Sequence, residues 1–367
     1  MSEVITCAGC GIPVQSENEL LPGYVPKAAL SREVITCQRC FRLTHYNEVP
    51  DVPYDNEDFL KLLKTIGEKK ALVVYLVDVF DFNGSWVPGI KTYIGKNDCL
   101  LVGNKLDILP KSTNLHKLEM WLGKMSKSLG LNPVDISLIS AEKGTGIEEL
   151  AEKIETYRND KDVYVVGCTN VGKSSFINKL IDLFGGNEAL KITTSRFPGT
   201  TLNFIDIPLD ETNTLYDTPG VMNPHQMAHF IDKEDLKVVM PKKELKPKVY
   251  QLNEEQTLFF GGLVRVDYLS GGRRSLVCYV SNELYIHRTK LEQADDLLER
   301  QLGDLLVPAY NQEVAKGLVP HSISLGEEGM DLVISGLGWL TVKGDKGAKF
   351  VVHAPKGVGV SKRPSII

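Results

Sequence analysis

Short apolar runs alternate with helical patterns over the middle of the chain, from about residue 56 to residue 220. Six of these runs predict β-strands, at residues 71–77, 99–103, 133–139, 163–167, 201–207 and 213–216. Between them, apolar residues recur at helical spacing over residues 115–129, 147–157 and 176–184. This alternation predicts an α/β domain whose mostly parallel sheet carries helices on both faces.

The two ends of the chain have a different texture. Residues 1–48 show little periodicity and hold four of the seven cysteines. Beyond residue 225, a helical stretch and a lysine-rich linker (237–248) come before β-rich runs at residues 258–268, 275–280, 284–287, 332–342 and 350–353, with one helix at about 289–302. We therefore expect three parts: a cysteine module at 1–48, the α/β domain at 49–225, and a linker with a β-rich α+β domain at 226–367.

Composition narrows the class of protein. Apolar residues make up 43% of the chain and charged residues 24%, as in folded globular proteins. The longest clean apolar run, 71–77, is far shorter than the roughly 20 residues of a membrane helix, and the N-terminus does not resemble a signal peptide. We expect a cytoplasmic protein with no membrane or DNA partner. The formal charge of −5 argues against a wholly basic nucleic-acid binder but allows a local basic face.

Four cysteines form two Cys-x-x-Cys pairs, Cys7 with Cys10 and Cys37 with Cys40. In a reducing cytosol, pairs with this spacing indicate metal ligands rather than disulfides. Four thiolates bind Zn²⁺ tetrahedrally and leave no open position, so the expected zinc is structural. Redox dithiols and free thiols are the alternatives.

A phosphate-binding loop is predicted where the strand at 163–167 meets the helix at 176–184. The sequence Gly167-Cys-Thr-Asn-Val-Gly172-Lys173-Ser174 matches the pattern G-x-x-x-x-G-K-[ST]. Glycines let backbone N–H groups surround the phosphates, Lys173 reaches the β and γ phosphates, and the Ser174 hydroxyl binds Mg²⁺.

Two further segments fit the γ-phosphate side of such a site. Asp217-Thr-Pro-Gly220 follows a predicted strand, which places a carboxylate for Mg²⁺ and a backbone N–H for the γ-phosphate. Between this tetrapeptide and the P-loop, Thr201 is our candidate for a threonine that closes on Mg²⁺, with Thr200 as the alternative.

The base-reading residues come earlier in the chain. Asn104-Lys105-Leu-Asp107 follows the strand at 99–103, and a carboxylate there accepts hydrogen bonds from guanine that adenine cannot donate. Asn104 would brace neighbouring loops, the Lys105 stem would pack along the base, and Ser140-Ala141 would offer the Ala141 N–H to guanine O6. The sequence thus predicts a site for GTP or GDP, and Asp107 argues against an ATP-using P-loop enzyme.

From these motifs we expect the nucleotide to contact one set of residues: Asn104, Lys105, Asp107, Ser140, Ala141, Gly167, Asn170, Val171, Gly172, Lys173, Ser174, Ser175, Asp217 and Gly220. Ser174, Thr201 and Asp217 would hold Mg²⁺, and Lys173, Asn170, Thr201 and Gly220 would act in hydrolysis.

The order of these motifs is that of a circular permutation, because the base motifs precede the P-loop and Asp217–Gly220 comes last. The sequence resembles the YqeH family of circularly permuted GTPases, which includes plant and mitochondrial nitric-oxide-associated proteins. The resemblance spans the whole chain. It implies a GTPase that acts in assembly of the small ribosomal subunit and binds rRNA or a subunit precursor, with a C-terminal domain thought to bind RNA. We separately expect a monomer in isolation.

Hydrolysis should be slow. Many GTPases place a water-orienting Gln after the D-x-x-G glycine, and this chain has Val221 there. In GTPases that resemble this one at G-x-x-N-x-G-K-S, the Asn helps to hold K⁺, so Asn170 suggests K⁺ stimulation. The alternative is that Asn170 only hydrogen-bonds within its loop.

The C-terminal domain carries local positive charge. Residues 341–367 hold six basic residues and one acidic residue, and with Arg265, Arg273, Arg274 and Arg288 they could form a phosphate-binding face. A solubilising tail is the alternative. For the whole protein, the alternative to a GTP-hydrolysing switch is a zinc- and RNA-binding module whose nucleotide site is a clamp with negligible hydrolysis.

Overall fold

A computed structural model describes residues 56–184, 193–196, 203–218, 220–221, 223–310, 314, 317–326, 329–343 and 347–367, and in the N-terminal part residues 5, 13–19, 23–32, 35, 37–38 and 53–54. The chain divides into two compact units. The first comprises Met1–Val79, Ser85–Leu106 and Glu119–Met222, and the second comprises Phe80–Gly84, Asp107–Leu118 and Asn223–Ile367. Among the described residues, no helix has the length and apolar character needed to cross a membrane.

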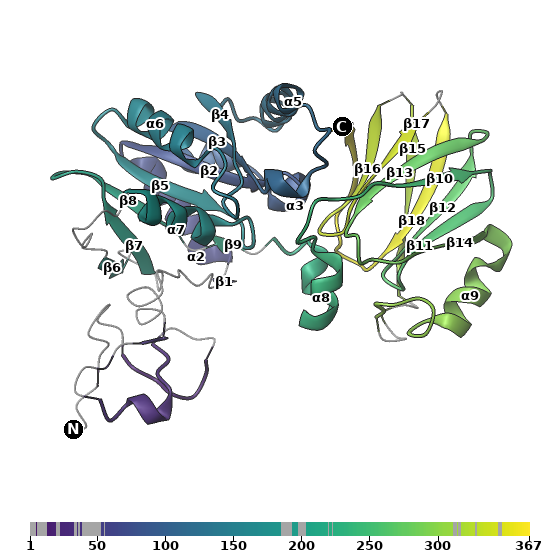
Figure 1. The fold of residues 1–367 in the computed structure, drawn as a ribbon, viewed down its shortest axis with the longest axis horizontal. Helices are drawn as coiled ribbons and strands as arrows, with labels where there is room; N and C mark the ends of the chain where they lie inside the picture. Colours follow the sequence, from purple (N-terminus) through teal and green to yellow (C-terminus); the bar gives the residue numbers. More distant parts are fainter. Residues whose placement is uncertain are drawn as a thin grey trace. The chain divides into compact units, whose positions relative to one another are not determined.

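The first unit is built on a seven-stranded sheet with the strand order β4-β3-β2-β5-β8-β7-β6 (Figure 1). Its strands are β2 (Ala71–Asp78), β3 (Asp98–Asn104), β4 (Asp135–Leu138), β5 (Asp162–Gly167), β6 (Thr193–Arg196), β7 (Asn203–Pro208) and β8 (Thr214–Asp217). The neighbouring strands β4, β3, β2, β5 and β8 pair in parallel, whereas β7 pairs antiparallel with both β8 and β6. β2 is buried along its whole length, as the uninterrupted apolar run at 71–77 requires for a strand covered on both faces.

Helices lie between strands of this sheet: α4 (Ile90–Ile94), α5 (Leu115–Ser128), α6 (Ile147–Arg158) and α7 (Lys173–Phe184), and α2 (Asn56–Glu68) precedes its first strand, β2. The chain moves outward through β2, β3 and β4 and then returns to β5 and β8. Because parallel crossovers are right-handed, this reversal puts α4 and α5 on one face of the sheet and α6 and α7 on the other. The observed mixed sheet thus keeps the predicted parallel core and adds an antiparallel edge.

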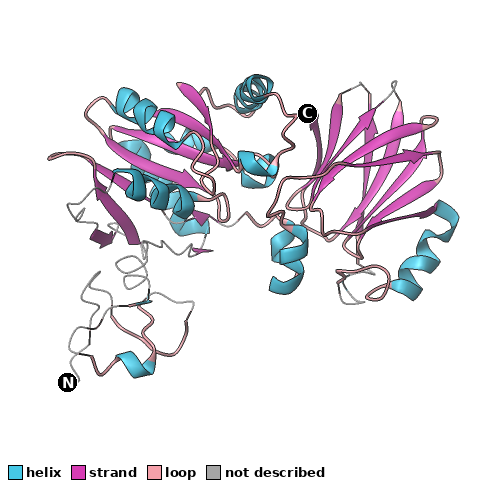
Figure 2. Ribbon diagram, in the orientation of Figure 1, coloured by secondary structure: helices cyan, strands magenta, loops and turns pink. Residues whose placement is uncertain are grey.

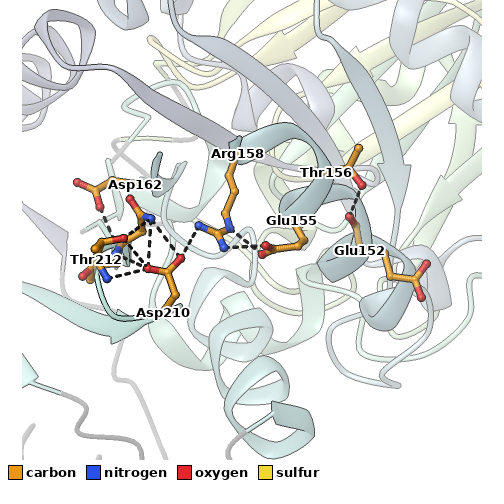
Figure 3. A network of polar contacts seen from close by, with 9 residues as sticks. Glu152, Glu155, Thr156, Arg158, Asp162, Asp210 and Thr212 are labelled. Atoms are coloured by element: carbon orange, nitrogen blue, oxygen red, sulfur yellow. Dashed lines mark hydrogen bonds and ion pairs between the residues drawn. The ribbon is translucent and has the colours of Figure 1, made fainter. Parts of the chain in front are cut away.

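An ionic network fixes the turn between β7 and β8 (Figure 3). Arg158, at the end of α6, contacts Glu155 at 2.6 Å and Asp210 at 2.8 Å. The Asp210 carboxylate also accepts the backbone N–H groups of Thr212 and Asn213, and these bonds lower its pKa. The turn that starts β8 is therefore tied to a helix on the same sheet.

Short elements complete this unit: the 3-10 helix η1 (Lys27–Ala29) and a two-stranded parallel sheet of β1 (Pro53–Tyr54) and β9 (Gly220–Val221).

The second unit contains two five-stranded antiparallel sheets (Figure 2). One has the order β10-β13-β17-β16-β19, with β10 (Lys248–Leu252), β13 (Arg274–Val280), β16 (Met330–Ile334), β17 (Gly338–Lys343) and β19 (Val360–Pro364). The other has the order β14-β11-β12-β18-β15, with β11 (Gln256–Phe260), β12 (Val264–Ser270), β14 (Ile286–Lys290), β15 (Val319–Leu325) and β18 (Ala348–Ala354). Apolar residues from both sheets form one buried cluster.

Five short helices belong to or extend into this unit: α3 (Phe82–Ser85), η2 (Leu106–Ile108), η3 (Met227–His229), α8 (Lys233–Val239) and η4 (Leu291–Gln293), followed by α9 (Ala294–Gln301). The Ala294 side of α9 packs on Phe259 of β11.

The expected β-rich runs differ from the observed strands in an informative way. The runs at 258–268 and 332–342 each contain two strands joined by a hairpin. The strands β10, β15 and β19 were not expected, and all three lie at sheet edges. In β15 burial alternates along the strand, so every second side chain faces water and the strand has no continuous apolar run to predict it.

Candidate functional site

The motifs from separate segments lie at the carboxyl ends of the parallel strands in the first unit's sheet. Gly167 ends β5, Asn104 ends β3 and Asp217 ends β8. Ser140 follows β4 after a single residue. Since the carboxyl ends of parallel strands lie at the same edge, the sheet itself gathers these residues, and this is where open α/β sheets bind ligands.

The P-loop runs from the end of β5 to the start of α7. Its turn uses left-handed backbone at Asn170 (φ 62°) and Gly172 (φ 92°). Lys173 is only 1% exposed, and its Nζ donates to the carbonyls of Gly167 (3.1 Å) and Cys168 (3.0 Å). The ammonium group is thereby held at the loop. Ser174 and Ser175 follow in the first turn of α7, half-buried and exposed respectively.

Gly220 lies directly beside this loop. A Cβ at Gly220 would stand 2.9 Å from Lys173 Nζ and 3.0 Å from Thr169 Cα, so the close approach requires glycine. The neighbouring Val221 carbonyl accepts the Thr169 N–H at 2.8 Å. Asp217 is buried at the end of β8, next to β5. The structure therefore brings Asp217–Gly220 to the P-loop, from which it is more than forty residues distant in sequence.

Asn104 joins the segment that we expect to read the base, residues 104–107, to two other loops. Its Nδ2 donates to the Val171 carbonyl in the P-loop (2.8 Å), and its Oδ1 accepts the Ala141 N–H (2.9 Å). The side chain is 1% exposed. A Cβ at Gly172 would lie 2.3 Å from Asn104 Nδ2, so this glycine gives Asn104 its access to the loop. The Ala141 N–H, which we expected to face guanine O6, is engaged by Asn104 here.

Lys105 has a partner that the sequence analysis missed. Its Nζ donates to Asp78 Oδ2 at 2.7 Å, and Asp78 is buried at the end of β2. A carboxylate that directly follows a buried apolar strand was the signal available in the sequence. Lys105 has left-handed backbone (φ 69°), and Asp107 lies in η2 just beyond it. Asp78 thus fixes the end of the side chain whose stem we expect to cover the base.

Ser140 is buried, and its Oγ accepts the Lys143 N–H at 3.0 Å, which shapes the loop after β4. The switch threonine candidates Thr200 and Thr201 lie outside the described residues. Their assignment to Mg²⁺ stays a prediction.

Of the four cysteines in the predicted zinc module, the structure describes one. Cys7, Cys10 and Cys40 lie outside the described residues, whereas Cys37 is buried against Val25. In the described part of the chain, no group of three or more His, Cys, Asp or Glu is placed to hold a metal ion. The zinc module therefore stays a prediction.

The other cysteines belong to the cores. Burial raises the pKa of Cys99 and of Cys278 to about 12, so both stay protonated thiols. The Cys168 thiol, in the P-loop, donates to the Ser85 carbonyl at 3.2 Å.

The proposed phosphate-binding face of the second unit loses three of its arginines. Arg265 pairs with Asp267 (2.7 Å) and with Asp295, Arg363 pairs with Asp331 (3.5 Å), and Arg274 is buried. Burial requires that such charges be paired, which the sequence pattern could not reveal. The members that stay exposed are Arg273, Arg288, Lys343, Lys349, Lys356 and Lys362, and Lys346 lies outside the described residues.

Comparison with known proteins finds GTPase and YqeH-like relatives. A family model described as "50S ribosome-binding GTPase" matches residues 162–258, and one described as "YqeH-like, C-terminal" matches residues 273–366. The chain is 54% identical over 367 residues to the protein YqeH of Bacillus subtilis, with all of both chains covered.

Plant proteins match over most of the chain as well. A putative nitric oxide synthase of rice is 30% identical over 420 residues, covering 98% of this chain and 77% of that protein. The NO-associated protein 1 of Arabidopsis thaliana is 30% identical over 394 residues, covering 93% of this chain and 70% of that protein. Since the similarity to YqeH runs the full length of both chains, this chain belongs to the YqeH family, and its nucleotide-binding unit is a P-loop GTPase domain.

Proposed function

We propose that this protein is a GTP-hydrolysing switch that acts in assembly of the small ribosomal subunit and binds rRNA or a subunit precursor in a nucleotide-dependent way. The observation that carries the nucleotide part is the bridge made by Asn104. One buried side chain links the base-reading segment, the P-loop carbonyl of Val171 and the Ala141 loop. An arrangement that fixes base and phosphate loops against each other suits a ligand that has both a base and phosphates.

The residues at the loop fit Mg²⁺. Ser174 supplies a hydroxyl in the first turn of α7, and Asp217 supplies a buried carboxylate at the end of the neighbouring strand. Hydroxyl and carboxylate oxygens are the hard ligands that Mg²⁺ prefers. With the nucleotide bound, the ion would neutralise charge on the β and γ phosphates. Lys173 would add its own positive charge there.

Slow hydrolysis is part of the proposal. Val221 is buried in β9 and has no group that could orient a water molecule. We expect turnover to rise in K⁺, with Asn170 as a ligand. Equal rates in K⁺ and Na⁺ would leave Asn170 with a role in its loop alone.

The proposal includes a structural zinc held by Cys7, Cys10, Cys37 and Cys40. Burial of Cys37 beside Val25 is compatible with a small metal-centred core. The test is metal analysis of the purified protein. Cys37→Ser should lose about one equivalent of zinc, and retention of the metal would reject the four-cysteine ligand set.

Nucleotide state would reach the C-terminal domain through residues 221–250, which follow Gly220. In the second unit, Asn223 Nδ2 donates to the Gly84 carbonyl (2.7 Å), and Gln226 Nε2 donates to Asp81 Oδ2 (2.9 Å). Through these bonds, residues 223–226 are held against residues 81–84, which follow β2 and include the start of α3. We expect hydrogen exchange in 221–250 to differ between GDP and a GTP analogue. Identical exchange in both states would reject this route.

The deciding experiment measures GTP, GDP and ATP binding by calorimetry, alone and with isolated small or large ribosomal subunits. Lys173→Ala serves as the nucleotide-free control. Guanine binding that tightens with small subunits only in the GTP state supports the proposal, because coupling is reciprocal. Coupling to large subunits would favour the partner that the GTPase family model's description names. Guanine binding without measurable turnover would favour the alternative, a nucleotide-gated RNA clamp.

A further inference from the structure

Helix α5 presents two contrasting faces. Leu118, Trp121 and Leu122 are buried. A Cβ at Gly123 would lie 3.2 Å from Ile136 Cδ1, so this side of the helix lies close to β4. The opposite side is exposed and carries Lys117, Met120, Lys124 and Lys127. We call these four residues the α5 stripe.

The spacing of the α5 stripe puts its members in one row. Positions i, i+3, i+7 and i+10 fall on one side of an α-helix, and the row is about 15 Å long at about 1.5 Å per residue. Met120, in the middle, is 50% exposed. An exposed methionine between lysines gives the row an adaptable apolar contact as well as charge.

Most of the positive charge of the α5 stripe does not stabilise the helix itself. Lys117 lies in the first turn, where the helix dipole disfavours a cation, and that turn has no acidic residue. Lys124 and Lys127 are three apart, a spacing at which like charges repel. Of the three lysines, only Lys127, in the last turn, has a favourable place relative to the dipole.

In the described part of the chain, the lysines of the α5 stripe are not neutralised by ion pairs with carboxylates. The helix has one carboxylate, Glu119, which is half-buried and off the row. Within the described residues, no ion pair involves Lys117, Lys124 or Lys127, whereas Lys153 of α6 pairs with Asp135 and Glu149, both at 3.4 Å. Three uncompensated positive charges in a row therefore stand on a chain whose formal charge is −5.

We propose that the α5 stripe binds the phosphate backbone of RNA. This inference rests on the proposed ribosomal function and adds a surface outside the C-terminal domain. Lysine ammonium groups suit phosphates as point charges without a fixed geometry, so the contact would position the protein without reading sequence. Charge complementarity selects a polyanion as the occupant.

The test removes the three charges together by Lys117→Gln, Lys124→Gln and Lys127→Gln. The control removes three exposed lysines that form no row, by Lys64→Gln, Lys91→Gln and Lys96→Gln. Binding to deproteinised small-subunit rRNA is measured at several salt concentrations by fluorescence anisotropy. For three phosphate contacts, the slope of log K against log salt should fall in magnitude by about 2 for single strands. The control should change it far less, and both variants should bind GTP as the wild type does.

Four other outcomes would overturn the inference. If both variants weaken RNA binding equally, total charge rather than the row is responsible. If the α5 variant binds naked rRNA normally but binds assembled subunits weakly, the row faces an acidic protein. If the wild type binds GTP but neither rRNA nor subunits, the ribosomal part of the proposed function fails together with the inference. Normal wild-type binding with an unaffected α5 variant removes the inference alone.

Discussion

Replacing Asn104 by alanine tests whether the bridge between loops organises the nucleotide site. The change removes two buried hydrogen bonds, to the Val171 carbonyl and from the Ala141 N–H. Val171 and Ala141 are themselves buried, so each backbone group loses its partner away from water. At about 1–3 kcal/mol for each orphaned group, Asn104→Ala should lower the free energy of unfolding by about 2–6 kcal/mol.

The chain offers a matched control at the other end of β3, where Asn97 directly precedes the strand. Asn97 is also buried, with Nδ2 donating to the Ile66 carbonyl (2.8 Å) and Oδ1 accepting the Ala71 N–H (3.1 Å). Asn97→Ala therefore loses the same two kinds of bond, and we expect a similar loss of stability. The nucleotide site lies at the opposite edge, since Ala71 begins β2.

Urea unfolding and GDP titration of both variants separate stability from site geometry. Both should unfold at lower urea, whereas only Asn104→Ala should weaken GDP binding, by about tenfold or more, which corresponds to about 1.4 kcal/mol. Equal GDP affinity in the two variants would refute the idea that Asn104 positions the loops. An unchanged unfolding midpoint for Asn104→Ala would refute the energetic estimate. Measurements below both midpoints keep each variant folded.

Three further changes have definite expected outcomes. Asp107→Asn should weaken GTP binding and improve binding of xanthosine nucleotides in calorimetry, and unchanged GTP affinity would remove the guanine assignment. Gly172→Ala should abolish nucleotide binding because its Cβ would lie 2.3 Å from Asn104 Nδ2, whereas Gly130→Ala, with similar left-handed backbone and nothing within 4 Å, should retain it. Because the pKa of Asp210 is lowered in the folded protein, its ionised carboxylate stabilises the fold above the unfolded pKa of about 4, and this stabilisation is lost as pH falls through the folded pKa. Asp210→Asn should therefore show a smaller decrease in the free energy of unfolding toward acid pH than the wild type. An equal decrease in both proteins would contradict this.

The positions of the chemical groups along the chain were largely readable from the sequence. The strand that ends at Gly167, the P-loop and the helix from Lys173 follow from an apolar run, glycine spacing and helical periodicity. Periodicity works there because those strands and helices are buried and their apolar patterns reflect it. The same reasoning misses edge strands such as β15, which has no continuous apolar run and is a strand because it pairs with its neighbour β18.

Contacts between distant segments were decided only by the tertiary structure. Nothing in the sequence pairs Asp78 with Lys105 or directs the Ala141 N–H to Asn104, because such bonds depend on where parallel strands end relative to each other. The buried Arg363 illustrates the same limit: its local sequence is that of a basic tail, and only the fold of the second unit places it against Asp331. Sequence thus predicted which residues would carry the chemistry, and packing decided which of them lie together.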